Sequence, residues 1–170
     1  TELIEGLRIP VVVLGAGAQA NVRFEPGKLA SMDDVVRRFV EAEIVPHVEA
    51  LEHGDMPPYD ILRKLYSSFG MDEMARARFQ KQIEREKRGE AKRDDIGEVV
   101  GRGEGAAAQL IPIIEMCRHC PGMVTAMGVS VALTSAAIMG KGTTRQKERW
   151  ALDLLTLDKI GAWAITEPGS

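Results

Sequence analysis

This chain of 170 residues has few cysteines and few aromatic residues, and it has no large excess of charge of either sign. With two cysteines the chain cannot form a disulfide scaffold, so we expect a reducing compartment. Aromatic residues make up 5% of the chain, which argues against a β-sandwich because its strands are usually rich in aromatic and β-branched residues. The formal net charge of −3 argues against a domain-wide basic surface, so we expect no nucleic-acid partner.

Hydrophobic residues make up 45% of the chain, and they recur with the spacing of helices. Ser31 and the acids after it indicate the start of the first helix, and Pro46 is expected to kink this helix. Thr143 and Gln146 have the spacing of a capping box at the start of the last helix. Helices are therefore expected over residues 31–53, 58–69, 106–116, 122–140 and 143–154. The pattern predicts an all-α fold, after which residues 160–166 continue in an extended conformation.

Residues 1–30 fit the helical pattern poorly. They contain a short apolar run that is followed by Gly15 and Gly17, which superficially fits a dinucleotide-binding motif. That motif needs a helix directly after its glycines, and Pro26 and Gly27 leave no helix of useful length there. The preferred interpretation is a flexible leader or an edge strand.

Charged residues are distributed unevenly along the chain. Residues 72–95 interleave both signs, and we interpret them as a solvated helix or a mobile insertion, with a partner-binding arm as the alternative. The run from His119 to Gly140 has no Asp, Glu, Lys or Arg and is long enough to raise the question of a membrane helix. Because it is rich in alanine and contains Pro121 and Gly122, we interpret it as a buried helix and expect no membrane span.

Cys117 and Cys120 have the spacing of a redox or metal motif. A zinc site would need two further ligands, and His47 and His53 are distant in sequence. A thioredoxin-like site would need a βαβ setting, which the pattern does not predict. The preferred interpretation is a pair of buried or partly buried thiols at a helix end, and no metal site is predicted. No Ser/His/Asp arrangement for nucleophilic catalysis is recognisable either.

The most specific pattern lies at the C-terminal end. Residues 142–147 are GTTRQK, and residues 159–170 are KIGAWAITEPGS. With the helix between them they strongly resemble the acyl-CoA dehydrogenase family, whose members have Gly-Thr-x-x-Gln-Lys, a helix, a turn and an aromatic residue shortly before Thr-Glu-Pro-Gly. The agreement runs without a gap from Gly142 to Ser170. A weaker likeness extends back to about Ser31, so the resemblance covers about two thirds of the chain.

The resemblance implies the N-terminal helical domain of the acyl-CoA dehydrogenase fold, with the start of a β-domain strand at its C-terminal end. It divides the chain into a leader of uncertain structure (1–30), a helical domain (31–160) with a charged insertion at about 72–100, and the start of a β-domain (161–170). The remainder of the β-domain is expected to be absent from this chain.

The resemblance also implies residues that contact a flavin. Trp163, Ile165 and Thr166 occupy positions at which family members contact FAD with side chains and main chain. In a strand, Trp163 and Ile165 would share one face, and Thr166 would offer a hydroxyl. A flavin has apolar ring faces and a polar edge, so these residue types suit it.

Family members line the acyl channel partly with the helix before Gly-Thr-x-x-Gln-Lys. In this chain that position implies Ala126, Val129 and Leu133 as channel residues, with Ala137 as a further candidate, although helix packing alone also accounts for them. The catalytic base of most members is a carboxylate in the C-terminal domain. No catalytic residue is therefore expected in this chain.

As a whole, the resemblance implies an FAD-dependent oxidoreductase that converts an acyl-CoA thioester into the 2-enoyl-CoA, as in fatty acid β-oxidation. A carboxylate would remove the α-proton, and the flavin would take the β-hydride. An electron-transfer flavoprotein is the implied acceptor, a homodimer or homotetramer the implied assembly, and the cytoplasm, or the mitochondrial matrix in a eukaryote, the implied location. The alternatives are a flavin oxidase or monooxygenase of the same superfamily, a non-catalytic relative, and a helical interaction module.

Overall fold

The computed structural model describes residues 26–90 and 104–169, and every regular element in these two ranges is helical. In chain order they are α1 (Pro26–Glu43), the 3-10 turn η1 (Val45–His47), α2 (Val48–His53), α3 (Tyr59–Ser68), α4 (Met71–Lys87), α6 (Glu104–Cys117), α7 (Pro121–Gly128), the π-helical stretch η2 (Val129–Thr134), α8 (Ser135–Lys141), α9 (Thr144–Gln146), the π-helical stretch η3 (Lys147–Ala151) and α10 (Leu152–Leu155). The predicted all-α fold is confirmed. The apolar run and glycine motif before residue 26, and residues 91–103, lie outside the described ranges.

Proline and glycine divide the helices as the sequence indicates. Pro46 lies in η1, which interrupts the helical region between α1 and α2. Helix α2 ends at Gly54, whose φ of 80° is left-handed and suits glycine. One boundary differs from the prediction, because α1 begins at Pro26 rather than near Ser31. A proline fits the first turn of a helix, where its missing N–H has no partner to lose.

The first part of the charged insertion is a helix. Helix α4 is mostly exposed, but the side chains of Phe79 and Ile83 are buried. They pack with the buried Ala151 in a small cluster that Ile138 and Leu155 border. Residues 71–87 are thus a solvated helix fixed along one side, which is one of the two structures expected for this stretch.

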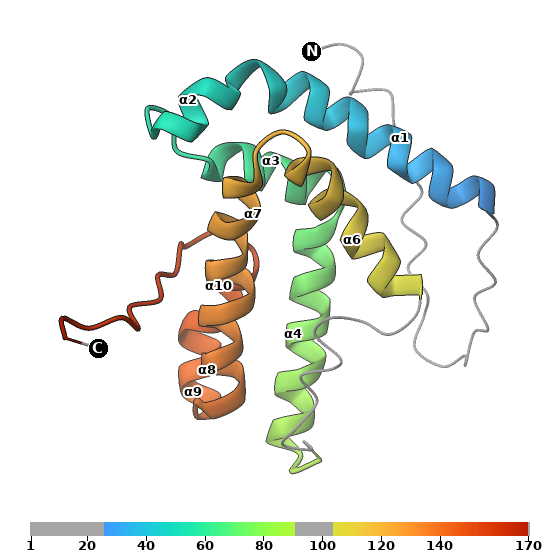
Figure 1. Ribbon diagram of the computed structural model, residues 1–170. Helices are drawn as coiled ribbons and strands as arrows, with labels where there is room; N and C mark the ends of the chain where they lie inside the picture. Colours follow the sequence, from blue (N-terminus) through green and yellow to red (C-terminus); the bar gives the residue numbers. More distant parts are fainter. Residues whose placement is uncertain (1–25, 91–103, 170) are drawn as a thin grey trace.

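The main core joins helices from both halves of the chain. In Figure 1, α1 lies across the top with α3 and α6 below it, whereas α4 and the stretch from α7 to α8 run toward the bottom. The rings of Phe39 and Phe69 meet edge to face, with centroids 5.9 Å apart. The buried residues of this core are Val36, Phe39, Val40, Ile44, Ile61, Leu62, Leu65, Tyr66, Met116, Cys120, Met123, Met127 and Leu157.

The uncharged run forms one helical stretch from Pro121 to Lys141, composed of α7, η2 and α8. By length and composition this stretch could cross a membrane, since one 18-residue window within it has a mean hydropathy of 1.7. Met123 and Met127 are buried in the main core, and Ser130 and Ser135 are buried further along. Leu133, in contrast, is exposed. The stretch predicted as a buried helix is therefore packed along one side and open along the other.

Candidate functional site

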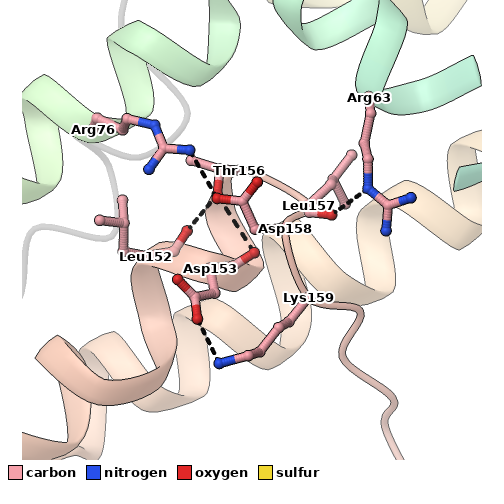
Figure 2. Close-up of polar contacts among 8 residues, drawn as sticks. All are labelled: Arg63, Arg76, Leu152, Asp153, Thr156, Leu157, Asp158 and Lys159. Carbon is pink, nitrogen blue, oxygen red and sulfur yellow. Dashed lines mark hydrogen bonds and ion pairs between the residues drawn. The ribbon is translucent and has the colours of Figure 1, made fainter. Parts of the chain in front are cut away.

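The segment that carries the predicted flavin residues leaves the helices through a turn at residues 156–159. Leu157 has a φ of 61°, a left-handed conformation that is rare for a branched residue, and its side chain is fully buried. Arg63 of α3 donates a hydrogen bond of 2.8 Å from Nε to the Leu157 carbonyl oxygen (Figure 2). The buried Leu157 side chain and the hydrogen bond to its carbonyl oxygen together hold the turn in this conformation.

A second arginine, from α4, holds the same turn. Arg76 donates from Nη2 to Asp158 Oδ2 at 2.7 Å, and the Thr156 hydroxyl donates to the same oxygen at 2.8 Å (Figure 2). The hydrogen bond from Thr156, followed by that from Arg76, lowers the pKa of Asp158 below its usual value. Lys159 adds an ion pair of 2.6 Å to Asp153. The position at which the chain leaves the helices is thus fixed by contacts to α3 and α4.

After this turn the chain forms neither helix nor strand through residue 167. Figure 1 shows this C-terminal segment, in dark red, extending away from the helices. Trp163 is 43% exposed and Ile165 is 71% exposed, and Thr166 is exposed as well. The strand expected from residue 161 is absent from the described residues, so the strand face that Trp163 and Ile165 were expected to share is absent too. A strand forms through hydrogen bonds to a second strand. The alternation of side chains within one segment therefore does not by itself produce a strand.

The beginning of this segment lies on η2, in the helical stretch of the predicted channel residues. The Gly161 N–H donates to Ser130 Oγ at 3.0 Å. Ala126 and Val129 are partly buried, and Leu133 is 51% exposed. The structure therefore anchors the segment with the predicted flavin residues to the helix with the predicted channel residues.

A shallow depression lies elsewhere, between the end of α8 and the helix that follows it. Its lining residues are Ala137, Ile138, Lys141, Gly142, Gln146 and Trp150. Trp150 also stacks under the Arg149 guanidinium, 5.0 Å from the ring centroid. Ala137, the further channel candidate, lines this depression, whereas Ala126, Val129, Leu133 and the predicted flavin residues do not.

The thiols are placed differently from one another. Cys117 is exposed, whereas Cys120 is buried in the main core, so the interpretation of two thiols withdrawn from solvent holds for Cys120 alone. Burial, and then a hydrogen bond of 3.2 Å to Glu52 Oε1, raise the pKa of the Cys120 thiol. In the part of the chain that the structure describes, no group of three or more His, Cys, Asp and Glu side chains could hold a metal ion.

Two carboxylates with little exposure were not singled out from the sequence. Glu115 accepts from Arg37 Nε at 3.4 Å and from Arg118 Nε at 3.0 Å. Glu86 pairs with Lys147 at 2.5 Å, across the junction of α4 and η3. Each is matched by a cation, so their evident role is to hold helices together. The polar residues Ser130 and Thr134 were also missed as contacts, although hydroxyls inside an apolar helix are a signal that could have found them.

Comparison with known proteins identifies the class of this helical domain. Residues 95–158, which include α6 to α10, match the family model described as acyl-CoA dehydrogenase, N-terminal domain. The short-chain specific acyl-CoA dehydrogenase, mitochondrial, of Rattus norvegicus is 28% identical over 134 residues, which are 79% of this chain and 28% of that protein. The proteins of the same name from Bos taurus and Homo sapiens are 34% and 33% identical over 73 residues, which are 43% of this chain and 18% of each relative.

The helical fold and these matches agree with the resemblance seen in the sequence, which is confirmed. The family-model match covers residues 95–158, and the likeness to the short-chain relatives extends over 134 residues at 28% identity. The chain spans no more than 28% of the length of the curated relatives described above. No solved structure gives a significant match to the chain.

Proposed function

We propose that this chain is the N-terminal helical part of an FAD-dependent acyl-CoA dehydrogenase, which oxidises the Cα–Cβ bond of an acyl-CoA thioester to the 2-enoyl-CoA. The observation that carries the proposal is the uninterrupted agreement of residues 142–170 with the family's sequence pattern. The match of residues 95–158 to the family's N-terminal domain supports it independently along the preceding helices. Membership of this family indicates an oxidoreductase of fatty acid metabolism.

The C-terminal segment has residues that fit a flavin. Trp163 and Ile165 are large apolar side chains that lie two positions apart and are exposed, so they offer apolar surface that a ligand could cover. They would contact the ring faces of FAD, while the exposed Thr166 would offer a hydroxyl to its polar edge. When bound, FAD supplies the acceptor for the hydride removed from the acyl chain.

The exposed side of the stretch from Pro121 to Lys141 suits an acyl chain. Ala126, Val129 and Leu133 are apolar and at least partly exposed, so they would line a channel without displacing core residues. The relatives are named for short-chain acyl-CoA, so butyryl-CoA, with its four-carbon acyl group, is the first substrate to test. Longer acyl-CoA thioesters would then define the length that the channel accepts.

Other parts of the function are proposed to lie outside this chain. A carboxylate elsewhere in the complete protein would remove the α-proton, since no residue of this chain is assigned as the base. An electron-transfer flavoprotein would accept the electrons, and the protein would assemble as a homodimer or homotetramer. In a eukaryote the location would be the mitochondrial matrix, which agrees with the printed names of the relatives.

The test is to purify the complete protein, identify any bound chromophore and add butyryl-CoA without oxygen. We expect a yellow protein that releases FAD on denaturation and whose visible absorption bleaches when the thioester is added. Rapid recovery of the colour on admission of air would indicate an oxidase or monooxygenase of the same superfamily. Bound FAD that no acyl-CoA bleaches would indicate a non-catalytic relative. A colourless protein that does not bind added FAD would contradict the proposal and favour a helical interaction module.

A further inference from the structure

Two hydroxyls of η2 reach consecutive residues of the C-terminal segment. Ser130 is fully buried, and its Oγ accepts the hydrogen bond from the Gly161 N–H at 3.0 Å. The same Oγ lies 3.5 Å from the carbonyl oxygens of Leu154 and of Lys159, either of which could accept its hydrogen. The buried hydroxyl thus lies between the end of α10 and the beginning of the segment.

Thr134 makes the next contact along η2. Its Oγ1 lies 3.4 Å from the Ala162 carbonyl oxygen and 2.8 Å from that of Val129. In the second contact the hydroxyl reaches back five positions, within the wide turn of the π-helix. π-Helical turns are rare and frequently occur at functional sites. Thr134 therefore contacts both the segment and the backbone of a proposed channel residue.

Gly161 permits this close approach because it has no Cβ. A Cβ at this position would lie 2.8 Å from both Cβ and Cγ2 of Thr134 and 2.9 Å from its Oγ1. Carbon atoms in contact are normally about 3.5–4.0 Å apart, so any other residue would push the segment away from η2. Gly140, in the same helical stretch, has no atom within 4 Å of its corresponding Cβ position. A Cβ is therefore accommodated at Gly140 but not at Gly161.

We propose that Ser130, Thr134 and Gly161 are positioning residues that set the register between the C-terminal segment and η2. Trp163 and Ile165 lie two and four positions after Gly161, so this register determines where the flavin ring is held relative to the helix of Val129 and Leu133. The inference rests on the proposed function. Hydride transfer needs the reacting atoms at about 3–3.5 Å, and a misplacement of about 1 Å can lower the rate a hundredfold.

The first experiment tests the register itself and needs no flavin. Hydrogen exchange of the peptide around residues 159–164 is measured in the complete protein for Ser130→Ala and for Ser135→Ala. Ser135 is the matched control, since it is equally buried and its hydroxyl bonds to Val131 within its own helix. We expect exchange about tenfold faster in Ser130→Ala and unchanged in Ser135→Ala. Equal exchange in the two variants would overturn the inference.

The second experiment tests the consequence for the flavin. Gly161→Ala and the control Gly140→Ala are compared by visible flavin spectrum, kcat and KM. We expect Gly161→Ala to shift the spectrum and lower kcat about tenfold with FAD content retained. Gly140→Ala should resemble the wild type.

The outcomes separate the two proposals. A Gly161→Ala protein with the spectrum and kcat of the wild type, or an equal loss in Gly140→Ala, would overturn the positioning role. A wild-type protein that binds no FAD would overturn the proposed function instead, while the exchange experiment would still decide whether Ser130 fixes the register.

Discussion

Lys147 Nζ lies 2.5 Å from Glu86 Oε1, although the two side chains are only 11% and 12% exposed. The pair joins η3 to the C-terminal end of α4, and the Thr144 hydroxyl reaches the other Glu86 oxygen at 3.4 Å. The pair adds a polar link to the apolar cluster of Phe79, Ile83 and Ala151, which also joins α4 to the family-matched helices.

Breaking this pair from one side should be costly. In Glu86→Gln the Lys147 ammonium loses its anionic partner in a place with little water, and we expect a loss of about 3 kcal/mol in the free energy of unfolding. The matched control is Glu148→Gln, since Glu148 pairs with Lys87 at 2.7 Å on the exposed surface of the same two elements. That variant should lose less than about 1 kcal/mol. Equal losses in urea unfolding would contradict this account.

Arg63 should stabilise the turn from which the C-terminal segment leaves. Arg63→Met removes the donor to the Leu157 carbonyl oxygen, and we expect a loss of about 1 kcal/mol because the arginine is partly exposed. Lys64→Met is the neighbouring control, which removes only an exposed ion pair to Glu43. Its effect should stay within about 0.5 kcal/mol. Chemical denaturation of both variants measures the difference, and no difference would exclude a stabilising role for Arg63.

Tyr66 should make the protein less stable in strong alkali. Burial raises the pKa of Tyr66 to about 12, compared with about 10 in an unfolded chain. The neutral phenol is favoured in the folded state, so stability is complete below pH 10 and declines as the unfolded chain ionises between pH 10 and 12. Two pKa units correspond to roughly 2–3 kcal/mol.

This pH dependence is tested by comparing unfolding of the wild type and Tyr66→Phe across that range. Lysines also titrate there, and the comparison removes their common contribution. Tyr66→Phe should lose less stability than the wild type between pH 10 and 12. The same alkaline decline in both proteins would show that Tyr66 is not its source.

Leu133 should matter for substrate and not for stability. It is 51% exposed on the open side of η2, and Leu110 on α6 is 50% exposed. Both Leu→Ala changes should therefore alter the free energy of unfolding by less than about 0.5 kcal/mol. Only Leu133→Ala should change KM for acyl-CoA, by about threefold or more, because it removes part of the proposed channel wall. A KM that is unchanged in Leu133→Ala, or equally changed in Leu110→Ala, would remove Leu133 from the channel.

Local features of the fold were predictable from the sequence because they depend on few neighbouring residues. Pro46 marks the break between α1 and α2. Thr143 and Gln146 form both hydrogen bonds of the predicted capping box, with the Gln146 N–H donating to Thr143 Oγ1 and the Thr143 N–H to Gln146 Oε1. In each case the residue types within four positions determine the structure.

Features that depend on distant residues were not predictable in this way. Arg63 and Leu157 are separated by 94 positions, and the sequence around either residue does not indicate the hydrogen bond between them. The left-handed conformation of Leu157 contradicts the preference of leucine and depends on its buried side chain and bonded carbonyl. The same reason explains the missing strand after Gly161, since alternation of side chains suggests a strand but only a partner strand forms one.

The central claim is that the C-terminal segment binds FAD, and two tryptophans of nearly equal exposure allow a direct test. Trp163 is 43% exposed on that segment, and Trp150 is 40% exposed on η3, stacked under Arg149. The measurement is the dissociation constant for FAD of the complete protein with Trp163→Ala or Trp150→Ala. We predict that Trp163→Ala weakens binding about tenfold or more and that Trp150→Ala changes it by less than about twofold. Equal affinities in the two variants would contradict the account.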